Sequence, residues 1–122
     1  MEFFKFFSSQ EKKEGELSID GILSLFHENN ISIHPTLRGE TDEETKTKLL
    51  NRIEQQRGDG TMQIVLTSDF GDGIRLVENE GELMITTCND FLDAERGIIS
   101  GSEGKRIKKL NKTFSRKKVA LQ

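Results

Sequence analysis

The apolar residues of this chain change their spacing near residue 60, and this change restricts the folds available to it. Before residue 60, two stretches place apolar side chains three and four positions apart, as on the buried face of an amphipathic helix. After it, three short stretches alternate apolar and polar residues, as in strands with one buried face. Since 122 residues suffice for one domain, this order predicts an α+β domain.

The first helical stretch covers residues 18–30. Ser18 is a favourable N-cap because its hydroxyl can accept a hydrogen bond from a backbone N–H of the first turn. The two asparagines at 29–30 are typical of a left-handed stop. The buried face of this helix is predicted to consist of Ile19, Ile22, Leu23 and Phe26.

The second helical stretch begins with a capping box and ends before Gly58. In such a box Thr41 caps the amide of Glu44, and the Glu44 side chain reaches back to Thr41. The acidic first turn also suits the positive end of the helix dipole. Between the two helices, residues 31–33 alternate and predict a short strand that Pro35 closes.

Three strands are predicted at 62–67, 74–77 and 83–87, joined by short loops that contain glycine. Connections this short favour an antiparallel meander. We therefore expect two helices packed on a three- to four-stranded antiparallel sheet, with a basic C-terminal helix or tail. A winged-helix arrangement, in which the three strands form the wing, is the alternative. The predicted core beyond the first helix is Ile33, Leu49, Ile53, Ile64, Leu66, Ile74, Leu76, Leu83, Ile85 and Phe91.

The composition divides the chain into four parts. Residues 1–16 form a Phe-rich segment, 17–99 the single α+β domain, 100–104 a Gly/Ser hinge, and 105–122 a basic amphipathic tail. In the first part, the aromatic spacing places four rings near one side of a helical turn. This cluster is either a partner-docking surface or a short helix folded onto the core. Its members are Phe3, Phe4, Phe6 and Phe7.

The charge distribution is the feature that points to function. The first 103 residues hold all 21 acidic residues and ten basic ones, a formal charge of −11, whereas the last nineteen residues carry +8. Such asymmetry is typical of a basic arm that contacts a polyanion. The candidate nucleic-acid-binding residues are Lys105, Arg106, Lys108, Lys109, Lys112, Arg116, Lys117 and Lys118.

Several uses of this basic tail remain open. Its apolar residues recur at helical spacing, so a basic amphipathic helix would suit nucleic acid, an anionic membrane surface or a partner's groove. The tail could equally be a solvated arm, or fold back on the acidic body. We take a non-enzymatic regulatory protein that binds nucleic acid, RNA or DNA, as the leading hypothesis. The alternative is a protein-interaction or inhibitor protein that acts through its acidic body, residues 1–103. Such a protein could be a cellular protein or a viral accessory protein.

Catalysis and metal binding have little support in the sequence. Cys88 is the one cysteine, so neither a disulfide nor a Cys-based zinc site can form within the chain. A small Cys–His enzyme that combines Cys88 with His27 or His34 is a third hypothesis. The loop at 68–73 lacks the spacing of a calcium loop. We expect no cofactor and no transmembrane segment. Because the sequence shows no secretory signal, we expect the protein to be cytoplasmic, and this cytoplasm could be that of an infected host cell.

Overall fold

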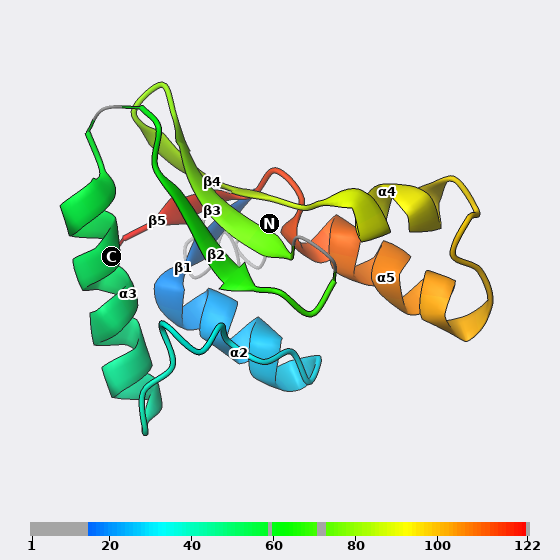
Figure 1. Ribbon diagram of the computed structural model, residues 1–122, viewed down its shortest axis with the longest axis horizontal. Helices are drawn as coiled ribbons and strands as arrows, with labels where there is room; N and C mark the ends of the chain where they lie inside the picture. Colours follow the sequence, from blue (N-terminus) through cyan, green and yellow to red (C-terminus); the bar gives the residue numbers. More distant parts are fainter. Residues whose placement is uncertain (1–14, 59, 71–72, 122) are drawn as a thin grey trace, which may run out of the picture.

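The computed structural model describes residues 15–58, 60–70 and 73–121, which form an α+β fold (Figure 1). The predicted Phe-rich cluster (Phe3, Phe4, Phe6 and Phe7) lies outside these residues. Within them are four helices and five strands, in the order β1 (Glu16–Ser18), α2 (Ile19–Glu28), α3 (Asp42–Gln56), β2 (Gln63–Thr67), β3 (Ile74–Asn79), β4 (Glu82–Thr86), α4 (Asn89–Glu95), α5 (Gly101–Phe114) and β5 (Lys118–Ala120).

The strands form one mixed sheet in the order β1-β5-β4-β3-β2. The three predicted strands form its antiparallel meander, β2-β3-β4. β5 pairs antiparallel with β4 and parallel with β1. The predicted α+β class is confirmed. The sheet was expected to be wholly antiparallel with three or four strands, but it has five strands and is mixed, because β1 and β5 form a parallel pair at one side. With three residues each, β1 and β5 are too short to show a period of two.

Residues 31–33, predicted as a strand, are not part of the sheet. Ile31 is buried in the core, whereas Ile33 is half-buried. The next residue, His34, donates its backbone N–H to the Leu66 carbonyl at 2.8 Å. The alternation at 31–33 therefore reflects a loop in which Ile31 is buried in the core, and not a strand paired in the sheet.

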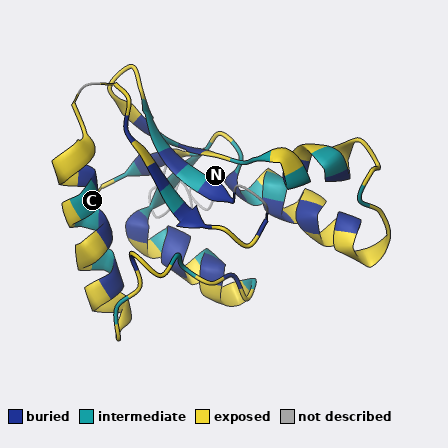
Figure 2. Cartoon of the chain, viewed as in Figure 1, coloured by how far each residue is buried: buried dark blue, intermediate teal, exposed yellow. Residues whose placement is uncertain are grey.

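The helices and the sheet share one hydrophobic core (Figure 2). Every predicted core residue except Ile33 is buried. The helical cap predictions also hold: Ser18 accepts a hydrogen bond from the Gly21 N–H at 2.9 Å, and Asn30 has a left-handed φ of 57°. The core also contains residues from the segment that was predicted to be a tail: Ile107, Leu110, Phe114 and Val119.

The segment predicted as a basic tail is an integral part of the fold. α5 packs its apolar side inward, where the Phe114 ring meets the Phe26 ring edge-on at 5.4 Å between centroids. The chain then enters the sheet as β5, between β1 and β4. Because these residues supply both a core helix and an internal strand, the domain extends through residue 121 and does not end at residue 99.

Residues 100–104, predicted as a flexible hinge, form the start of α5. Gly104 is buried, and a Cβ atom at this position would lie 2.4 Å from the Ile99 carbonyl oxygen. The glycine therefore allows the helix to approach the preceding connection closely. Glycine and serine suit flexible linkers and close contacts alike, so composition alone did not separate these two roles.

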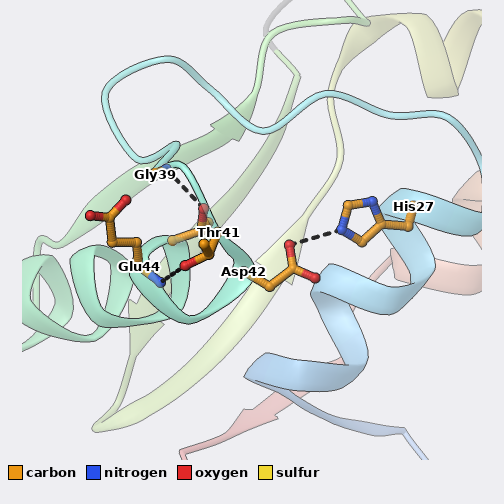
Figure 3. Close-up of polar contacts among 6 residues, drawn as sticks. His27, Gly39, Thr41, Asp42 and Glu44 are labelled. Atoms are coloured by element: carbon orange, nitrogen blue, oxygen red, sulfur yellow. Dashed lines mark hydrogen bonds and ion pairs between the residues drawn. The ribbon is translucent and has the colours of Figure 1, made fainter.

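The capping box of α3 forms with one change of partner (Figure 3). The Thr41 hydroxyl accepts a hydrogen bond from the Glu44 N–H at 3.1 Å, as predicted. The Glu44 carboxylate accepts the backbone N–H of Glu40 instead of that of Thr41. Asp42 in the same turn contacts His27 of α2 at 3.0 Å, which ties the two helices together at the surface.

Replacing Thr41 with Ala removes this cap and should lower the free energy of unfolding by about 1 kcal/mol. The matched control is Thr47→Ala, an exposed position in the interior of the same helix. Alanine favours helix there, so the control should be at least as stable as the original protein. Chemical denaturation measures both. Equal stabilities for the two variants would mean that the Thr41 cap does not stabilise α3.

Truncation after residue 103 should abolish folding, because it deletes β5 and the buried residues of α5. Replacing one buried large side chain with Ala costs about 2–5 kcal/mol, whereas the whole stability of a domain is about 5–15 kcal/mol. The truncated protein should therefore show no cooperative thermal transition by circular dichroism. A cooperative melt close to that of the full chain would show that α5 and β5 are dispensable.

Candidate nucleic-acid interface

Four lysines form a continuous line on the outer side of α5. Lys105, Lys108, Lys109 and Lys112 recur at i, i+3, i+4 and i+7, and all four are exposed. We call this set the lysine stripe. It extends for roughly 10 Å along the helix, given a rise of about 1.5 Å per residue. In the part of the chain that the structure describes, none of the four ammonium groups makes a hydrogen bond or an ion pair.

The direction of the lysine stripe follows from the packing of α5. Its apolar residues repeat on the opposite side of the helix, where Ile107, Leu110 and Phe114 are at most 2% exposed. With that side fixed in the core, the lysines have no orientation available other than toward solvent. The exposed and buried residues of α5 alternate accordingly in Figure 2. The stripe is therefore held in place by the core.

One edge of the lysine stripe borders α4, which lies beside α5 (Figure 1). Between the two helices is a shallow groove of about 420 Å³, lined by the four lysines and by Glu95 of α4. We call it the α4–α5 groove. No lysine nitrogen lies within 4.0 Å of the Glu95 carboxylate among the described ion pairs. The groove therefore presents four cations and one anion that form no ion pair with one another in the described structure.

A short hydrogen-bond chain orients Glu95. The Thr87 hydroxyl donates to the Asn111 Oδ1 atom at 2.8 Å, and the Asn111 Nδ2 group donates to a Glu95 carboxylate oxygen at 3.4 Å. The reverse orientation of the Asn111 amide would point its oxygen at the carboxylate, which is repulsive. Sequence reasoning did not identify Glu95, because nothing in its local pattern indicates that α4 packs beside the lysines.

Arg106, predicted as a nucleic-acid contact, points away from the lysine stripe. Its guanidinium carbon lies 5.4 Å from the centroid of the Phe70 ring, and its Nη2 group donates to the Asn29 carbonyl at 3.1 Å. Asn29 is the C-cap of α2, where a cation is favourable beside the negative end of the helix dipole. Arg106 thus joins α5 to α2 and to the loop before β3.

The last three predicted basic residues lie in and before β5. Arg116 turns the chain with a φ of 60°, and its backbone N–H donates to the Ile85 carbonyl. The Lys117 carbonyl accepts the Ile85 N–H at 2.8 Å. Lys118 lies on the exposed side of β5 and pairs with Glu82 at 3.4 Å. These residues are separated from the lysine stripe by the end of α5.

The residues of the hypothetical Cys–His site make separate contacts. The Cys88 thiol donates to the Phe70 carbonyl at 2.7 Å, whereas His27 contacts Asp42 and His34 contacts Thr36. No contact in the described residues joins the thiol to an imidazole. The described residues also contain no group of three or more His, Cys, Asp or Glu side chains able to hold a metal ion.

No protein-family model, curated protein or solved structure matches this chain. Among the described residues, no helix is both long enough and apolar enough to cross a membrane.

The two kinds of basic residue on α5 should differ in their effect on stability. Arg106→Ala removes a ring contact and a hydrogen bond, so it should lower the free energy of unfolding by about 1 kcal/mol. Lys109→Ala changes a lysine of the stripe about one helical turn after Arg106. It should change the free energy of unfolding by less than about 0.5 kcal/mol. Urea denaturation distinguishes them. Equal effects would indicate that Arg106 does not anchor α5.

Proposed function

We propose that this protein binds nucleic acid through the lysine stripe, which contacts the phosphate backbone. The observation that carries the proposal is the state of Lys105, Lys108, Lys109 and Lys112: exposed, aligned and without partners in the described structure. Lysines that neutralise phosphates release condensed counterions, and this release supplies affinity without sequence recognition. A stripe fixed on a packed helix binds with a smaller loss of backbone entropy than a flexible arm.

The charges of the rest of the domain would orient this contact. The acidic first turn of α3 (Asp42, Glu43 and Glu44) belongs to the helix at the opposite end of the molecule from α5 in Figure 1. A polyanion would therefore be attracted to the α5 end and repelled from the first turn of α3. Charge separation of this kind steers association as well as strengthening it.

The burial of α5 favours nucleic acid over the other polyanion in question, an anionic membrane. An amphipathic helix that lies in a membrane inserts its apolar face. Here that face (Ile107, Leu110 and Phe114) belongs to the protein core and is not available. The same burial disfavours insertion of α5 into a partner's apolar groove. An interaction at the surface, made by charged groups alone, is what the exposed side of α5 supports.

The described aromatic side chains give no platform for base stacking. Phe26, Phe70, Phe91 and Phe114 are all buried. Binding by this part of the chain would thus depend on phosphate charge, and it would fall steeply as salt rises.

Replacing all four stripe lysines with Gln should abolish nucleic-acid binding and leave the fold intact. Gln is a good helix former, and these ammonium groups make no hydrogen bond or ion pair in the described structure. In a salt series with labelled RNA and DNA duplexes, each lysine lost should reduce the slope of log K against log salt by about 1. Fluorescence anisotropy gives the affinities, and circular dichroism gives the folded state.

The matched control removes the same amount of charge from the other end of the molecule. It carries Gln at Lys46, Lys48, Arg52 and Arg57 of α3 and its C-cap. Unlike the stripe lysines, three of these residues make polar contacts, so circular dichroism must show that this variant is folded before its affinity is compared. Its affinity should stay within about threefold of the original, since the attraction that it loses is long-range and screened. Equal losses in both variants would show a net-charge effect and no specific stripe. A full chain that binds neither duplex would disprove the proposal and favour the acidic body as the interaction surface.

A further inference from the structure

We infer that Glu95 makes the α4–α5 groove selective for duplex RNA over duplex DNA, by accepting a hydrogen bond from a ribose 2′-hydroxyl. This inference rests on the proposed function, because it assumes that the lysine stripe holds the phosphates. It goes further by assigning a role to the one anionic side chain that lines the groove.

The position of Glu95 is unfavourable for a site that binds phosphate alone. Its carboxylate shares the groove with all four stripe lysines, but it forms no described ion pair with any of them. The Asn111 amide donates a hydrogen bond to it at 3.4 Å. Glu95 is exposed, and this one hydrogen bond directs its carboxylate toward the groove, so a backbone that fills the groove meets a negative charge there. This repulsion is offset only when the ligand offers the carboxylate a hydrogen-bond donor.

RNA and DNA differ in this respect. The sugar–phosphate backbone of DNA carries hydrogen-bond acceptors and no donor, whereas each ribose of RNA adds a 2′-hydroxyl that can donate. In an RNA duplex these hydroxyls line a wide and shallow minor groove that protein side chains can reach. An ionised carboxylate can only accept hydrogen bonds, so Glu95 is chemically complementary to the RNA backbone and repels that of DNA.

The two helices divide the recognition between them. The lysines project from α5, and Glu95 projects from the neighbouring α4. Each ribose lies between successive phosphates, so in the arrangement that we infer, a strand held along the roughly 10 Å stripe has sugars beside the groove wall formed by α4. Phosphate contacts then give affinity, and the carboxylate gives discrimination by the sugar.

The test compares three duplexes of one sequence: RNA, DNA, and RNA with every 2′-hydroxyl methylated. The methylated duplex keeps the A-form but has no donor at the 2′ position. The original protein should bind the RNA duplex at least about tenfold more tightly than either of the others, as one added hydrogen bond to a charged acceptor would give. In Glu95→Ala, binding of DNA and methylated RNA should tighten, and the RNA preference should fall below about twofold.

The matched control is Glu103→Ala, which removes one exposed carboxylate from α5 outside the groove lining. It should strengthen binding to all three duplexes by a similar factor and keep the preference. If the original protein binds the three duplexes equally, or if the preference persists in Glu95→Ala, the inference about Glu95 is wrong while the lysine stripe remains a binding site. If the original protein binds none of them, the proposed function fails as well.

Discussion

Burial of the apolar side of α5 is the interaction on which the other features of this structure depend. Ile107, Leu110 and Phe114 complete the core that α2 and the sheet leave open, and they fix the rotation of the helix about its axis. That rotation directs the lysines toward solvent. It also places the end of the helix where the chain can turn at Arg116 and enter the sheet as β5, between β1 and β4.

Stability and the candidate site are therefore carried by different sides of one helix. The inner side of α5 cannot change without loss of packing, because removal of a buried side chain leaves a cavity. On the outer side the stripe lysines make no hydrogen bond or ion pair in the described structure, and the polar contacts to other helices lie at its edges, where Arg106 contacts α2 and Asn111 contacts α4. Those edge contacts hold α5 beside α2 and α4. Mutation of a stripe lysine therefore changes the charge of the stripe, whereas mutation of an edge or core residue changes its position.

The sequence predicted the elements whose determinants are local. The Thr41 cap, the Ser18 cap and the alternation of β2 to β4 depend on residues close together in the chain, and the structure contains them. What it did not predict depends on distant partners. The three-residue strands β1 and β5 form because they pair with each other, although they lie near opposite ends of the described chain. The position of Glu95 beside the lysine stripe likewise requires knowledge that α4 packs beside α5.

The charge of the C-terminal segment is also divided by the fold in a way that composition does not reveal. A flexible arm with all eight basic residues on phosphates would give a slope of about −7 in log K against log salt for duplex DNA, whereas four lysines would give about −3.6. Lys118 is paired with the Glu82 carboxylate, and Arg106 is engaged with the Phe70 ring and the Asn29 carbonyl, so either side chain would have to give up these contacts to reach a phosphate. Arg116 and Lys117 lie at the turn into β5, beyond the end of α5. A structured stripe and a free arm of identical sequence thus differ about twofold in salt dependence, because the fold leaves four of the eight cations on the stripe.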